Sequence, residues 1–135
     1  MMFTVFLSAF RGERTFEQNV LKSAELASLL INQGYTPEVV AGFYPENGGQ
    51  TVTFEQSYAV RCDRMYDVLV LARLAGDAFQ QECVMVVDVL DRMKASYVWP
   101  EGDSEELGFL RRKTEQPEGA RSQWRGAWWT VEATA

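Results

Sequence analysis

The spacing of apolar residues changes period several times along the first 90 residues, and this order constrains the fold more than any other feature. Period-two alternation is typical of a β-strand, whereas apolar residues three and four positions apart are typical of an amphipathic helix. The patterns predict a strand over 3–10, a helix over 15–31, strands over 39–44 and 51–61, a helix over 64–80 and a strand over 83–90. This is the ferredoxin-like split βαβ order, in which an antiparallel α+β sheet carries both helices on one face.

Capping residues place the ends of the two helices. Thr15 precedes the first helix and Gln18 follows three residues later, which is the spacing of a capping box. Gly34 lies where the apolar period ends and is expected to stop that helix. Asp63 is the candidate N-cap of the second helix.

The strand over 51–61 has two unlike faces. One face carries Val52, Phe54, Gln56, Tyr58 and Val60, and the other carries Thr51, Thr53, Glu55, Ser57 and Ala59. Glu55 is thus a carboxylate in the middle of a face of small residues. If that face is covered, the carboxylate must be paired or directed at a ligand. The alternative is a Glu55 exposed to water, and the spacing alone leaves both readings open.

The last 45 residues give weaker signals. We expect a turn over 91–94, a short strand over 95–99, an acidic loop over 100–107 and irregular polar chain from 108. The tryptophan-rich segment 124–131 indicates a last strand or a packing arm. We therefore expect a single domain over 1–135, with a core of about 1–99 and an extension of about 100–135. Because one sheet face lacks helical cover, that face or the sheet edges are expected to meet another subunit.

Charge and targeting features restrict the partners. The formal charge of −6 and the lack of a long basic run argue against nucleic acid and anionic membranes, because both attract Lys and Arg patches. A small cationic ligand fits this charge better. No apolar run reaches the ~18 residues of a membrane span, and the first 11 residues do not form a signal peptide. We expect a cytoplasmic protein.

The chain contains no histidine, which restricts its chemistry most. Histidine-based triads and zincin motifs are excluded, and the two cysteines, Cys62 and Cys83, are too few for a zinc site without histidine. Free thiols in a reducing cytosol are expected instead. No phosphate-binding glycine motif occurs, and the acidic cluster 103–106 is interpreted as a solvated loop, not as a metal site. We therefore expect neither a metal nor a cofactor.

Four short segments form an ordered set along the chain: Ser8-Ala9-Phe10-Arg11, Val60-Arg61-Cys62, Ala72-Arg73-Leu74-Ala75 and Glu82-Cys83-Val84. Weaker matches continue in Val98-Trp99 and in Pro117-Glu118-Gly119-Ala120. In their order and separation these segments resemble the phage enzymes that degrade S-adenosylmethionine. The resemblance spans nearly the whole chain, although 12–42 aligns poorly.

The resemblance implies a specific reaction and assembly. Enzymes of this family, once described as hydrolases, are lyases in which the carboxylate of S-adenosylmethionine attacks the substrate's own γ carbon. The products are 5′-methylthioadenosine and L-homoserine lactone, and no cofactor takes part. The family fold is a homotrimer of sandwiches similar to the PII signalling proteins, with active sites between subunits. The phage uses the activity in the host cytoplasm to deplete the methyl donor and blunt restriction.

Two residues carry over from the family as catalytic candidates. Glu55 matches a family glutamate just before the Val-Arg-Cys segment. Tyr44 matches a tyrosine at the end of the second strand, where it can stack on the substrate or form a hydrogen bond with it. An ordinary role as a hairpin aromatic remains open for Tyr44.

Three further residues are candidate substrate ligands. Glu82 matches an acidic position before Cys83, although a structural role at that junction is open. Ser8 and Arg11 follow the first strand, at the end where sheets often present binding groups. Arg11 is expected either to hold a carboxylate or to pair with Glu13.

Two other functions remain open at this stage. A PII-like trimer that binds an adenine nucleotide would signal without turnover, although such a protein normally presents basic residues to the phosphates. A phage protein that acts by contact with a host enzyme would use exposed tryptophans near Trp128. Fold alone does not decide between them.

Overall fold

The computed structural model describes residues 2–133, which contain two α-helices and eight β-strands. In chain order the elements are β1 (Phe3–Ser8), α1 (Phe16–Asn32), β2 (Glu38–Glu46), the 3₁₀ turn η1 (Asn47–Gly49), β3 (Thr51–Cys62), α2 (Met65–Phe79), β4 (Val84–Asp88), β5 (Lys94–Val98), β6 (Ser104–Lys113), β7 (Arg121–Trp124) and β8 (Ala127–Glu132).

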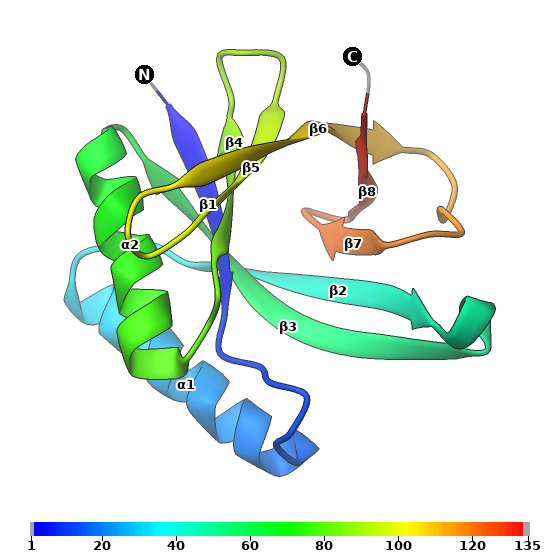
Figure 1. Ribbon diagram of the computed structural model, residues 1–135, viewed down its shortest axis with the longest axis horizontal. Helices are drawn as coiled ribbons and strands as arrows, with labels where there is room; N and C mark the ends of the chain where they lie inside the picture. Colours follow the sequence, from blue (N-terminus) through cyan, green and yellow to red (C-terminus); the bar gives the residue numbers. More distant parts are fainter. Residues whose placement is uncertain (1, 134–135) are drawn as a thin grey trace.

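The eight strands close into one antiparallel barrel, in the order β1-β3-β2-β7-β8-β6-β5-β4 (Figure 1). The prediction of an open, ferredoxin-like and PII-like sandwich is therefore wrong. β4, β1, β3 and β2 lie side by side as the split βαβ order requires. However, β5 and β7 pair with the two edges of that sheet, and β6 and β8 join them. Closure pairs every strand with two neighbours, although β7 covers only Ala41, Gly42 and Phe43 of β2.

The error comes from residues 100–123, which were expected to be loop and irregular chain. β6 occupies Ser104–Lys113 and β7 occupies Arg121–Trp124. Acidic residues at the start of β6 and basic residues at its end surround a short apolar stretch, 107–110, so the segment is polar in composition. An antiparallel strand with one face toward water tolerates such charges, because only its inward positions must be apolar.

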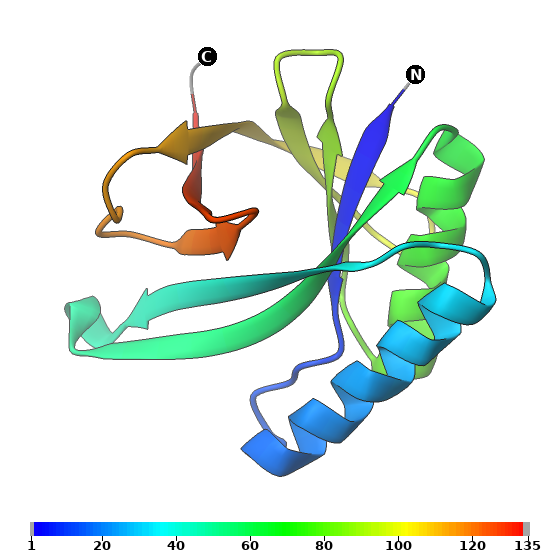
Figure 2. The same ribbon diagram turned by 180° about the vertical axis from the view of Figure 1, so that it is seen from behind.

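The sheet separates two apolar cores. Figures 1 and 2 show α1 and α2 together on the outer side of β1, β3 and β4, where they cover the first core. This core contains Val5, Leu26, Leu30, Val60, Val68, Leu71 and Phe79. The second core lies inside the barrel and contains Val40, Ala59, Val87, Ala95, Leu110 and Trp124. The two faces expected for 51–61 thus take opposite sides, with Val60 under the helices and Ala59 inside the barrel.

The face without helices is covered by the C-terminal strands of the same chain. Phe6 points into the barrel and packs edge-on against Trp124, with ring centroids 5.1 Å apart. Tyr58 lies under α1, where its hydroxyl donates to the carbonyl oxygen of Ser23 at 3.1 Å. The C-terminal strands therefore supply the apolar cover that was expected from a neighbour, and a single chain does not test the trimer.

The local helix signals have different outcomes. Thr15 caps α1, and its hydroxyl accepts from the amide of Gln18 while the Gln18 side chain accepts from the amide of Thr15, which confirms the capping box. Asp63 does not cap α2, because the N-cap is Arg64 and no side chain forms a capping hydrogen bond there.

No helix among residues 2–133 combines the length and apolar character needed to cross a bilayer.

Candidate active site

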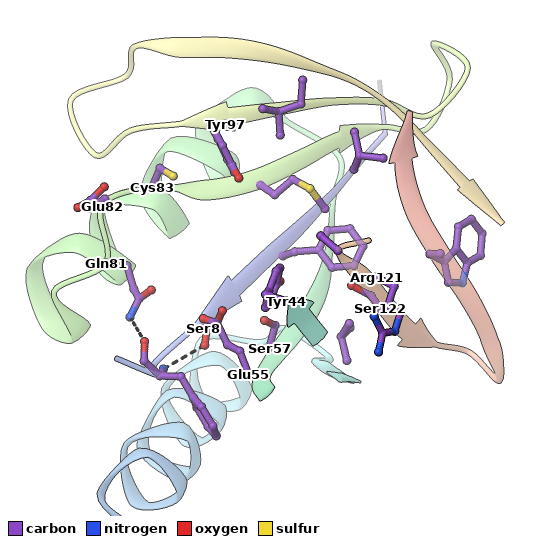
Figure 3. A pocket seen from close by; sticks show the side chains of 18 of the residues that line it. Ser8, Tyr44, Glu55, Ser57, Gln81, Glu82, Cys83, Tyr97, Arg121 and Ser122 are labelled. Atoms are coloured by element: carbon purple, nitrogen blue, oxygen red, sulfur yellow. Dashed lines mark hydrogen bonds between the residues drawn. The ribbon is translucent and has the colours of Figure 1, made fainter. Parts of the chain in front are cut away.

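A cavity of about 860 Å³ opens between the barrel interior and the chain that follows β1. The five residues predicted as site residues, Ser8, Arg11, Tyr44, Glu55 and Glu82, all line it. They come from the end of β1, the loop after it, β2, β3 and the α2–β4 connection (Figure 3). The structure therefore brings together, within one chain, residues that are up to 74 positions apart in the sequence.

Glu55 lies in the middle of β3 and points into this cavity (Figure 3). Its carboxyl is largely shielded from solvent, so the reading in which it faces bulk water does not hold. Burial raises the pKa of Glu55. No arginine or lysine of the described chain contributes to the pKa. A carboxylate in this position gains free energy when a cationic ligand arrives.

Tyr44 stands on β2 beside Glu55. Burial, with the neighbouring Glu55 and Tyr97, raises the pKa of Tyr44 to about 12. The phenol is therefore protonated at neutral pH and available as a hydrogen-bond donor. Its ring is partly open to the cavity, which leaves a face for stacking as well.

Ser8 holds the end of β1 in place. Its hydroxyl donates to the carbonyl of Gln56 at 2.8 Å and accepts from the amide of Phe10 at 3.0 Å. Because its single hydrogen is engaged by Gln56, Ser8 can offer a ligand only an acceptor without rearranging.

Arg11 pairs with Glu13, the second of the two alternatives weighed for it. Its guanidinium also donates to the carbonyl of Gln80, and its backbone is held by Asn19, whose side chain accepts from the Arg11 amide at 2.9 Å and donates to its carbonyl at 3.1 Å. Arg11 thus ties the loop after β1 to the end of α2. Glu82 is exposed and also lines the cavity.

The residues with polar side chains that line the cavity but were missed in the sequence include Ser57, Gln81, Tyr97, Arg121, Ser122 and Thr130. Ser57 lies two residues after Glu55 on the same small face, so the alternation of β3 carried the signal. Burial raises the pKa of Tyr97, and Cys83, Glu105 and Glu55 add to the shift. Ser122 belongs to β7, and no local pattern indicated that β7 would lie opposite β2.

Cys62 and Cys83 are both free, and Cys62 is buried whereas Cys83 is partly buried and lines the cavity. Burial raises the pKa of Cys62 to about 12 and also raises that of Cys83, so both thiols are protonated at neutral pH. Within residues 2–133 no three His, Cys, Asp or Glu side chains gather as a metal site would require.

The fold and cavity define a small-ligand protein, an α+β barrel whose pocket is lined by the carboxylates of Glu13, Glu55 and Glu82 and by the guanidinium groups of Arg11 and Arg121. Arg11 is paired with Glu13, so Glu55 is the buried carboxylate that can receive a cationic group of a ligand. The sequence matches the S-Adenosylmethionine lyase family over residues 5–132. This span is nearly the whole chain, so the protein belongs to the S-adenosylmethionine lyase family and is an enzyme of that class. Its substrate, S-adenosylmethionine, carries a sulfonium and an ammonium group. A search of curated proteins found no match.

Proposed function

We propose that the protein cleaves S-adenosylmethionine to 5′-methylthioadenosine and L-homoserine lactone. A carboxylate oxygen of the substrate bonds to its own γ carbon while the bond from that carbon to sulfur breaks. The electron pair of the broken bond stays on sulfur, which leaves as a neutral thioether. The observation that carries this proposal is the convergence of Ser8, Tyr44 and Glu55 on one cavity in a member of the lyase family.

The absence of histidine is compatible with this reaction. The leaving group departs neutral, so no general acid has to protonate it. The nucleophile belongs to the substrate and is already ionised at neutral pH, so no general base has to activate it. The chain needs only to fold the methionine part of the substrate into a near-attack geometry, which can supply several kcal/mol of the barrier.

The apolar part of the cavity wall adds a second contribution. A carboxylate surrounded by water is a weak nucleophile, and exchanging part of its hydration shell for the apolar side chains of Phe6, Leu110 and Trp129 makes its attack easier. Charge on the reacting groups disappears as the bond forms. An apolar surface near the sulfonium therefore favours the transition state over the ground state.

Glu55 is assigned to the substrate ammonium or the ribose hydroxyls and not to the sulfonium. A carboxylate against the sulfonium would stabilise the positive charge that the reaction removes, and would slow the reaction. The ammonium keeps its charge throughout, so binding it costs nothing at the transition state. Tyr44 then donates a hydrogen bond or stacks on the substrate, and Ser8, Arg11 and Glu82 are further candidate substrate ligands in the cavity lining.

The reaction is tested by incubating purified protein with S-adenosylmethionine in ¹⁸O-water and separating the products. We expect 5′-methylthioadenosine together with initially unlabelled lactone. Homoserine labelled directly in its γ hydroxyl would restore hydrolysis, and the absence of methylthioadenosine would reject both. The non-catalytic nucleotide binder rested on a PII-like fold, and the closed barrel removes that basis.

The biological role proposed is phage counter-defence in the host cytoplasm. Loss of S-adenosylmethionine would deprive host methyltransferases of their donor and blunt methyl-dependent restriction. This role is supported by the resemblance to phage enzymes. Host cells that produce the protein should show undermethylated DNA, and cells that produce Glu55→Gln should not. Normal methylation in both would reject the role.

A further inference from the structure

Gly42 occupies the centre of the site without a side chain of its own. In the β2–β3 pairing it lies opposite Glu55, and in the β2–β7 pairing it lies opposite Ser122. Three adjacent strands therefore bring Glu55, Gly42 and Ser122 side by side on the inner face of the barrel. Glu55 and Ser122 both line the cavity, and Gly42 between them is buried.

The ring of Tyr44 covers Gly42. Tyr44 follows two positions later on the same face of β2, and its side chain bends back along the strand. A Cβ placed on Gly42 would lie 2.8 Å from the Tyr44 hydroxyl, 2.9 Å from Cε2 and 3.1 Å from Cζ. These separations are shorter than normal van der Waals contact, so Tyr44 can lie in this place only because residue 42 has no side chain.

The backbone gives no other reason for this glycine. Gly42 has no left-handed φ, unlike Gly34 or Gly108, so an L-residue can adopt its conformation. A glycine within a strand also weakens the strand, because it loses more conformational entropy on folding and has no side chain to pack. Gly42 therefore lowers the stability of β2, and the close approach of the Tyr44 ring accounts for a glycine at this position.

We propose that Gly42 is a positioning residue that holds the Tyr44 ring against the floor of the cavity, beside Glu55. The proposal rests on the proposed function, because it assigns Tyr44 to the substrate. Gly42 itself touches no substrate atom. Its absent side chain provides the space that sets where the Tyr44 hydroxyl lies.

The test compares Gly42→Ala with Val39→Ala. Val39 lies on the same strand as Gly42, is exposed and does not line the cavity, so it is a control for a change of side chain on β2. We expect kcat to fall about 100-fold in Gly42→Ala, as for a misplaced catalytic contact, with a smaller change in KM. Val39→Ala should stay near wild type. In a Tyr44→Ala background, Gly42→Ala should cause little further loss, because the two residues act through one contact.

A second readout does not depend on turnover. In protein labelled with 3-fluorotyrosine, the ¹⁹F resonance that is missing in Tyr44→Phe identifies Tyr44. This resonance should move in Gly42→Ala and stay in place in Val39→Ala. The readout remains valid if the wild-type protein yields no methylthioadenosine, so failure of the proposed function and failure of this inference are distinguishable.

Three outcomes would overturn the inference. One is an unchanged Tyr44 resonance in Gly42→Ala, and another is a displaced resonance with unchanged kcat in an otherwise active enzyme. The third concerns folding: if Gly42→Ala does not fold, Gly42→Ala/Tyr44→Ala must fold, because the nearest atoms to the added methyl all belong to Tyr44. A double variant that also fails to fold would show that the glycine serves the strand.

Discussion

At the scale of single residues, Glu55 is held in a state that disfavours its charge. It faces the cavity from β3, and burial raises its pKa, to which no arginine or lysine of the described residues contributes. Such a group is destabilising in the empty protein and gains when a cation binds. A conflict between stability and binding at one residue is typical of a functional site.

Glu55→Gln should lower turnover of S-adenosylmethionine by about 100-fold or more, because the substrate ammonium or ribose loses its charged partner. The products are separated by chromatography. Glu46→Gln is the matched control, since Glu46 is exposed on β2 and does not line the cavity. Equal rates in Glu55→Gln and the wild type would remove Glu55 from the site.

Glu55→Gln should also change the pH dependence of stability. A carboxyl whose pKa is raised in the folded state stabilises the fold fully below its ordinary pKa, and this contribution is lost as the pH rises through the raised value. The Tm of Glu55→Gln, relative to that of the wild type, should therefore increase as the pH passes through this range. A constant Tm difference would mean that the carboxyl ionises without penalty.

At the scale of elements, α1 is stabilised by a defined cap and α2 is not. Thr15→Ala removes the hydroxyl that accepts from the Gln18 amide, so the free energy of unfolding should fall by about 1 kcal/mol. Asp63→Ala is the control and should change it little, because no side chain caps α2. Urea denaturation measures both variants. Equal losses would mean that the Thr15 cap adds nothing to the stability of the protein.

The element that closes the barrel depends on Gly108. This residue of β6 has φ +139°, and an added Cβ would lie 2.1 Å from the carbonyl oxygen of Glu132 on β8. It also lies beside the register shift between Ala95 and Ser96 on β5. Gly108→Ala should lower the free energy of unfolding by about 2 kcal/mol or more, because backbone must move. Gly119→Ala, with open space around the added methyl, is the control. A stable Gly108→Ala would contradict the close approach.

At the scale of the whole molecule, the barrel makes the last third of the chain part of the core. A chain ending at residue 99 would lose β6, β7 and β8, and would expose the edges of β2 and β5 together with Phe6. We expect it to aggregate or lack a cooperative unfolding transition in circular dichroism. A truncated chain that unfolds cooperatively as a soluble species would show that the split βαβ sheet is a domain by itself.

Much of the first 90 residues was predictable because their apolar periods are strong. The alternation in β3 correctly separated Val60 from Ala59, and the same alternation placed Glu55 and Ser57 on the inner face. β6 was not predictable in this way, since its charged ends conceal a strand of which only a short middle stretch is apolar. Ser122 and Tyr97 were missed as cavity residues for the same reason, because their place depends on which strands become neighbours.

The sequence by itself determined the chemistry available to the protein: no histidine, a net negative charge, and one carboxylate in the middle of a small strand face. It also determined the helix and strand order up to Asp88, because apolar periodicity and helix capping depend only on residues that are close together in the sequence. Only the tertiary structure decided that the sheet closes and that Gly42 provides the space for Tyr44. Strand pairing and ring packing join residues far apart in the chain, and no local pattern encodes which of them will meet.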